Sequence, residues 1–176
     1  TLGQGAVTVS ATTTDVAGNV SVAATPINFT LDSLVPVAPV FAVVAGADFA
    51  TTAEATATGA VTVTAEAGAS VSVVFSNGVN SVTKTIIGNA NAQPVVLAVG
   101  DLGTLGNGLI TVNATATDAS GNVSNAATPA SFTLDTLAPV APTFVVSAAT
   151  ANATVAEATA GAVTVTAELG STVTVN

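Results

Sequence analysis

The sequence contains a long internal repeat. Residues 1–41 align without a gap on residues 104–144, which corresponds to a shift of 103 positions. The segment VTVTAEAG at residues 61–68 returns as VTVTAELG at residues 163–170, at a shift of 102. A period of about a hundred residues matches the size of a small domain, and repetition at a fixed period is typical of arrays of similar units.

Proline-rich segments mark the boundaries between the predicted units. They read VPVAP at residues 35–39 and APVAP at residues 138–142. Proline fixes φ, so each segment is expected to form a short, extended and stiff link. The predicted domains are the end of a first unit at residues 1–34, a complete unit at residues 35–137 and the start of a third at residues 138–176.

The composition favours β-structure within each unit. Val, Ala and Thr dominate, Phe is the only aromatic residue, and turn residues recur every eight to twelve positions in the complete unit. Short strands at such spacing are typical of a β-sandwich. The sequence therefore predicts an all-β chain of tandem immunoglobulin-like β-sandwich domains, arranged end to end. The strands expected in the complete unit are residues 41–44, 60–65, 70–76, 81–87, 94–99, 109–117 and 123–134.

The charge balance limits the partners of this chain. Lys84 is the only basic residue against ten acidic ones, which gives a net charge of −9. Such a surface repels nucleic acid and anionic lipid and attracts cations. No apolar run is long and unbroken enough to cross a bilayer, so no membrane insertion is expected in this segment. The acidity and the near absence of lysine fit an extracellular protein of a cell surface.

The residue inventory argues against catalysis. The chain has no His, Cys, Tyr or Arg, so the usual nucleophiles and general bases are missing. A pair of carboxylates of the glycosidase kind would remain, but the Trp and Tyr residues that hold sugars are absent. We therefore expect neither enzymatic activity nor a small-molecule substrate.

Three motifs resemble one kind of protein when taken together. They are ATDASGNVS at residues 116–124, FTLDTLAPVAP at residues 132–142 and AEATAGAVTVTAELGSTVTV at residues 156–175. In this combination they resemble the bacterial Ig-like tandem repeats of giant type I-secreted, RTX-type, calcium-dependent adhesins and biofilm surface proteins. The resemblance implies an array that extends from the bacterial surface toward a ligand-binding tip and is made rigid by calcium near the domain junctions.

Acidic residues recur at equivalent positions of the repeat. Calcium takes six to eight oxygen ligands, and carboxylates that return every unit suit such a site. In an Ig-like topology, Asp32, Glu66 and Asp118 are expected to meet at the first junction, with Asn122 adding a carbonyl oxygen. Glu54, Asp101 and Asp135 are expected to face Glu168 at the second. The recurring pairs are Asp15 with Asp118, Asp32 with Asp135, Glu54 with Glu157, and Glu66 with Glu168.

Simpler roles are open for the same residues. Asp118, Gly121 and Asn122 suit a tight turn without any metal, because Asp and Asn side chains bond the local backbone. Asp32 and Asp135 could simply end a strand, and Glu66 and Glu168 could be solvated charges in exposed turns. Asp48 has Ala151 as its counterpart and is given no role.

The favoured function is a structural extender, or stalk, of a bacterial cell-surface adhesin that supports adhesion or biofilm formation. Its expected partners are the neighbouring repeats of the same chain and Ca²⁺, with other copies of the protein as a further possibility. Two alternatives stay open: a self-assembling extracellular filament subunit, and a module that binds carbohydrate or ice.

Overall fold

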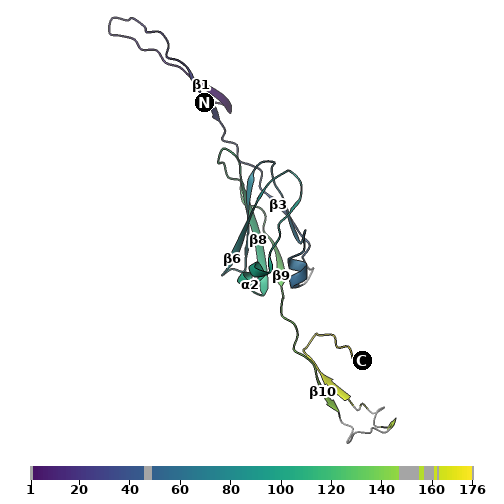
Figure 1. The fold of residues 1–176 in the computed structure, drawn as a ribbon. Coiled ribbons are helices and arrows are strands. Elements are labelled where there is room, and N and C mark those ends of the chain that lie inside the picture. The colour runs from purple at the N-terminus through teal and green to yellow at the C-terminus, as the bar shows by residue number, and fades with distance from the viewer. Residues whose placement is uncertain (1, 46–48, 147–154, 157–160, 162, 176) are drawn as a thin grey trace. The chain divides into compact units, whose positions relative to one another are not determined.

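The computed structural model describes residues 2–45, 49–146, 155–156, 161 and 163–175. The chain divides into two compact units, Thr1–Asp135 and Thr136–Asn176. Strands make up most of the regular structure in both units (Figure 1). In the described part of the chain, no helix has the length and apolar character needed to cross a membrane.

Residues 40–134 form a β-sandwich of two antiparallel sheets. One sheet has the strand order β3-β4-β7 and the other the order β6-β5-β8-β9. Both sheets, with Ala55, Leu102 and Leu105, contribute to one hydrophobic core. The predicted all-β sandwich is therefore confirmed. Its strands are β3 (Val40–Val43), β4 (Val61–Thr64), β5 (Ser70–Ser76), β6 (Ser81–Ile87), β7 (Gln93–Pro94), β8 (Gly108–Thr117) and β9 (Ala130–Leu134).

The central strand β5 of the larger sheet and its hairpin with β6 show why this sequence folds as predicted. Burial alternates along β5, where Val71, Val73 and Phe75 are completely buried and the residues on the other face are not. Because side chains point to opposite faces at a period of two, this alternation places one face on the core. The following turn closes the β5–β6 hairpin: the Oδ1 atom of Asn77 accepts hydrogen bonds from the N–H groups of Val79 and Asn80, at 2.8 and 2.7 Å.

Among residues 49–134, two helices occur where none was predicted. Helix α1 (Thr52–Ala55) begins with a capping box, in which Thr51 and Glu54 bond each other's backbone N–H groups. Helix α2 comprises Val99–Leu105. The strand predicted at residues 94–99 is therefore wrong at Val99, where the helix begins, and β7 ends at Pro94. Strand β7 is limited to Gln93–Pro94, although the N–H of Val95 still bonds the carbonyl oxygen of Val61 at 2.9 Å.

The last strand of the sandwich is shorter than the predicted range of residues 123–134. Before β9 begins, the N–H groups of Ser124 and Ala127 bond the carbonyl oxygens of Ala116 and Ala114, both at 2.8 Å. The three residue steps from Ser124 to Ala127 thus lie opposite only two residue steps of β8, from Ala116 to Ala114. This mismatch interrupts the regular ladder until Ala130.

The parts of the neighbouring repeats form hairpins with the same pairing. In the hairpin of β1 (Gly5–Val9) and β2 (Ile27–Leu31), Val7 pairs with Phe29, as Ile110 pairs with Phe132 in the complete repeat. In the hairpin of β10 (Thr143–Val146) and β11 (Val163–Thr166), the pairing of β3 with β4 recurs.

The aromatic residues of the repeats differ in burial. Sequence register predicts that Phe29, Phe41, Phe132 and Phe144 all belong to cores. Phe132 is 5% exposed and Phe41 packs against the core. Phe29 and Phe144 are 48% and 54% exposed, so the prediction is wrong for them. In the described structure, each belongs to a two-stranded sheet without the second sheet that covers Phe132.

Candidate functional site

The D-x-x-G-N motif forms a compact turn after β8. The Oδ1 atom of Asp118 accepts hydrogen bonds from the backbone N–H groups of Ser120 and Asn122, at 2.8 and 2.9 Å. Its Oδ2 atom accepts from the Nδ2 atom of Asn122 at 2.8 Å. Gly121 has a φ of 91°, a left-handed conformation that glycine adopts readily. Asp118, Gly121 and Asn122 thus form a tight turn, which is the simpler role that the sequence leaves open for them.

Asp15 forms the same network in the first hairpin. It accepts from the N–H groups of Ala17 and Asn19 and from the side chain of Asn19, at 2.9, 2.8 and 2.8 Å. The hydrogen bond from the side chain of Asn19 is the main cause that lowers the pKa of Asp15, and that from Asn122 lowers the pKa of Asp118 in the same way. A carboxylate that accepts several N–H donors is stabilised in its charged form.

This network predicts an acid-sensitive contribution to stability. The folded pKa of Asp118 lies below its unfolded value, so its contribution is present above about pH 4 and is lost as the pH falls through the folded pKa. We expect Asp118→Asn to lower the melting temperature at pH 7, with the difference from wild type shrinking as the pH falls toward pH 2. Thermal unfolding followed by circular dichroism from pH 7 to pH 2 measures this difference. A constant difference across the range would contradict the prediction.

Asp32 lies against the turn of the following repeat. Its Oδ2 atom accepts a hydrogen bond from the Oγ atom of Ser120 at 2.9 Å, and its backbone oxygen accepts from the Nδ2 atom of Asn122 at 3.3 Å. Its Oδ1 atom accepts from the N–H of Leu34 at 3.1 Å. Sequence reasoning missed Ser120, because its counterpart in the repeat is Ala17 and recurrence gave no signal there.

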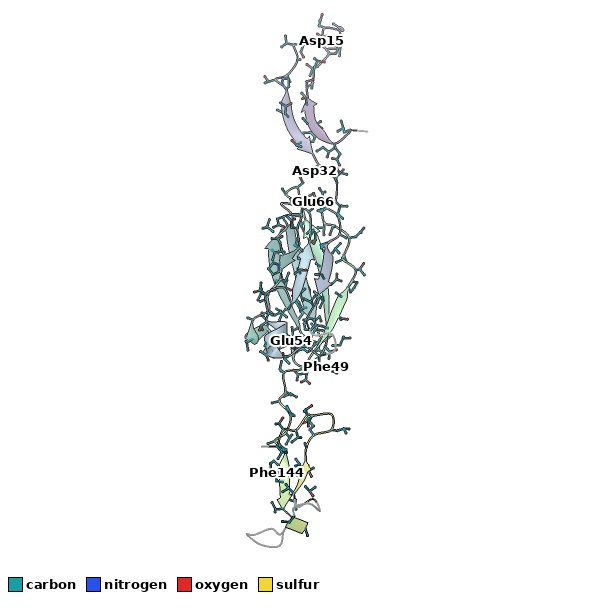
Figure 2. The ribbon with its side chains drawn as sticks, turned by 90° about the vertical axis from the view of Figure 1, so that its right-hand side faces the viewer. Asp15, Asp32, Phe49, Glu54, Glu66 and Phe144 are labelled. Atoms are coloured by element: carbon teal, nitrogen blue, oxygen red, sulfur yellow. The ribbon has the colours of Figure 1, made fainter. Side chains whose placement is uncertain are left out.

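The three acidic residues expected at the first junction surround one cavity. Asp32, Glu66 and Asp118 all line an open cavity of about 320 Å³. Figure 2 shows Asp32 near Glu66, at the end of the sandwich opposite to Glu54. The Oε2 atom of Glu66 accepts a hydrogen bond from the N–H of Val37 at 3.4 Å. The residues therefore come together from three segments that are far apart in the sequence.

The residues expected at the opposite end have separate contacts. Glu54 accepts from the N–H and Oγ1 groups of Thr51, at 2.9 and 2.8 Å, and the backbone contact is the main cause that lowers its pKa. Asp101 pairs with Lys84 at 2.5 Å, and this contact is the main cause that lowers the pKa of Asp101. Asp135 accepts from the Nδ2 atom of Asn107 at 3.4 Å. Each of the three carboxylates thus has a local role.

The other two predicted ligands lie toward the C-terminus. Glu157 lies outside the described residues. Glu168 follows β11, and its Oε2 atom accepts from the N–H of Val140 at 3.0 Å.

The carboxylate oxygen atoms of the residues that line the cavity are of the kind that binds a hard cation. Carboxylate and backbone oxygens are the ligands that calcium prefers, at 2.3–2.6 Å. Among the described residues, however, no group of three or more acidic side chains is close enough to hold a metal ion. Asp32, Glu66 and Asp118 would have to turn toward one another and exchange some of their present hydrogen bonds.

The fold and the turns define the class of protein. The described chain holds one β-sandwich and two further two-stranded sheets whose sequences repeat parts of it, and every acidic residue in the described segments lies outside the strands. Lys84, in β6, is the only charged residue within a described strand. Charge is therefore concentrated in the turns, links and short helices.

Solved structures that are similar to the chain include repeats of large adhesins. No protein-family model matches the chain, and the comparison with curated proteins gives no match. The chain is similar to the tetra-tandem repeat in the extending region of a large adhesion protein, with 26% identity over 82% of this chain and 35% of that chain, at a TM-score of 0.46.

Two further structures come from bacterial adhesins. One is a Ca²⁺-stabilised adhesin that helps an Antarctic bacterium reach out and bind ice, with 24% identity over 84% of this chain and 35% of that chain, at a TM-score of 0.37. The other is a 1.5-MDa bacterial ice-binding adhesin, with 20% identity over 81% of this chain and 46% of that chain, at a TM-score of 0.36. The chain thus spans less than half of each of these three structures.

Proposed function

We propose that this chain is part of the extender, or stalk, of a secreted bacterial cell-surface adhesin and serves adhesion or biofilm formation by spacing a tip away from the cell. The observation that carries the proposal is the contact of Asp32 with Ser120 and Asn122, because it links the end of one repeat to a turn of the next. A spacer requires such contacts between consecutive repeats.

The dimensions of the repeat suit a spacer. The longest strand of the sandwich, β8, has ten residues. At about 3.4 Å per residue, a strand of this length spans roughly 30 Å, so reach grows with the number of repeats. The residues on the described strands are uncharged apart from Lys84, so the acidic turns and links are the places where a cation would act.

Calcium is proposed to stiffen the junction that Asp32, Glu66 and Asp118 surround. These three carboxylates would hold the ion, with Asn122 adding an oxygen from its side chain. The ion would supply charge neutralisation and a cross-link between residues of adjoining repeats. Without it, the three carboxylates repel one another, because no basic side chain lines the cavity.

Scattering tests the proposed stiffening. We expect the maximum dimension of the chain, measured by small-angle X-ray scattering, to be larger and better defined with millimolar calcium than with a chelator, because extracellular modules bind calcium with dissociation constants of about 10⁻⁴–10⁻³ M. Asp118→Asn should abolish the response. Asp15→Asn is the matched control, because it removes the same turn carboxylate away from the junction cavity and should leave the response intact. Equal dimensions with calcium and chelator in wild type would reject the calcium mechanism.

A further inference from the structure

One hydrogen bond recurs at the proline-rich links of two repeats. The Oε2 atom of Glu66 accepts from the N–H of Val37 at 3.4 Å, and the Oε2 atom of Glu168 accepts from the N–H of Val140 at 3.0 Å. Val37 and Val140 occupy the same position in the two links, and both glutamates precede the same turn. The contact therefore forms independently in two units of the structure.

The link needs an external anchor to have a fixed direction. Prolines restrict φ inside the VPVAP segment, but they provide no N–H with which it could be tied to the domain. Pro36 and Pro39 are buried, whereas Val37 between them is exposed. Its N–H is one of the few donors that the segment has. A bond at this position fixes the link where packing alone does not hold it.

Glu66 is attached to a well-fixed part of the sandwich. Its carbonyl oxygen accepts from the N–H of Ala69 at 3.2 Å and lies so close to Gly88 that a Cβ atom there would be 2.2 Å away. Gly88 in turn donates to Ala69 and accepts from Gly68, at 2.8 and 2.9 Å. The backbone of Glu66 thus has little freedom, and its side chain can transmit that rigidity to the link.

We propose that Glu66 and Glu168 are positioning residues that clamp the proline-rich link to the repeat that follows it without a metal ion. The inference rests on the proposed spacer function, since only a spacer requires a defined direction between repeats. The clamp acts through the acceptor oxygen of the glutamate. The calcium mechanism, in contrast, requires its negative charge.

Glutamine and alanine variants separate these two requirements. Because the chain has no Cys, spin labels can be attached at Thr30→Cys in β2 and Thr83→Cys in β6, both of which are exposed. In chelator, we expect Glu66→Gln, which keeps an acceptor oxygen, to give a distribution of label distances as narrow as that of wild type. Glu66→Ala should give a clearly broader one.

Amide exchange provides a second readout in each unit. In chelator, Glu66→Ala should accelerate exchange of the Val37 amide about tenfold, because a hydrogen bond to a charged group is lost. The Val140 amide should be unaffected. Glu168→Ala should have the reverse effect, so each variant is the control for the other.

The outcomes distinguish the clamp from the calcium mechanism. The clamp is overturned if, in chelator, the distribution of label distances in Glu66→Ala is as narrow as in wild type. It is also overturned if the distribution in Glu66→Gln is as broad as in Glu66→Ala. If calcium leaves the distance distribution of wild type unchanged, the calcium mechanism fails, but a broad Glu66→Ala distribution would still support the clamp.

Discussion

Replacing Phe132 by alanine is expected to lower the free energy of unfolding of the complete repeat by about 3–5 kcal/mol, the usual cost of removing a buried aromatic side chain. Phe132 is 5% exposed and lies in β9, within the single core that both sheets share. The cost combines lost burial with a cavity that the surrounding valines and alanines are too small to fill. Urea unfolding followed by circular dichroism measures it, since the chain has no Trp to report by fluorescence.

The repeat supplies a matched control for this substitution. Phe29 is the counterpart of Phe132, but it is 48% exposed in the β1–β2 hairpin. Phe29→Ala should leave the unfolding of the sandwich within about 0.5 kcal/mol of wild type, as expected for a surface position. A similar loss in both variants would mean that the hairpin and the sandwich unfold as one body.

Replacing Gly88 by alanine is expected to destabilise the repeat by about 1–3 kcal/mol or more, because the new methyl group overlaps atoms that cannot easily move. The Cβ atom would lie 2.2 Å from the carbonyl oxygen of Glu66 and 3.2 Å from the carbonyl carbon of Ala65, both of them backbone atoms. The same unfolding measurement detects the loss.

Gly103→Ala is the control with the opposite sign. Gly103 lies on the exposed side of α2, and a Cβ atom there has nothing within 4 Å. Alanine in a helix is favoured over glycine by about 0.5–1 kcal/mol, so a small gain in stability is expected. A gain at Gly88 as well would show that the turn around Glu66 is looser than the structure indicates.

The strands could be predicted wherever local pattern and turn chemistry agree. The predicted bounds of residues 70–76 and 81–87 are those of β5 and β6, since alternating burial and the Asn77-Gly78 turn together fix the hairpin. Helix α1 was missed, although Thr51 and Glu54 have the spacing of a capping box, because four residues give no periodicity. Helix α2 was missed because Val and Leu at residues 95–105 fit a strand equally well.

The positions of the candidate site residues could be predicted better than their contacts. Recurrence and the order of strands suggested that Asp32, Glu66 and Asp118 meet, and the three line one cavity. Their hydrogen-bond partners Ser120 and Val37 could not be predicted from the sequence. The hydroxyl group of Ser120 has no counterpart in the repeat, and Val37 donates through its backbone N–H, which is not specific to a residue type. Whether the carboxylates hold calcium depends on side-chain rearrangement, which a pattern of residues does not encode.

The position of Lys84 bears on how molecules with many such repeats avoid sticking to one another. β6 is the outer strand of its sheet, and its unpaired backbone groups could align with those of another copy. Lys84 lies in the middle of this strand and is held there by Asp101 of α2. A lysine at such a place disfavours strand-to-strand aggregation. The single basic residue of the chain thus stands where the sheets of two copies could otherwise pair edge to edge.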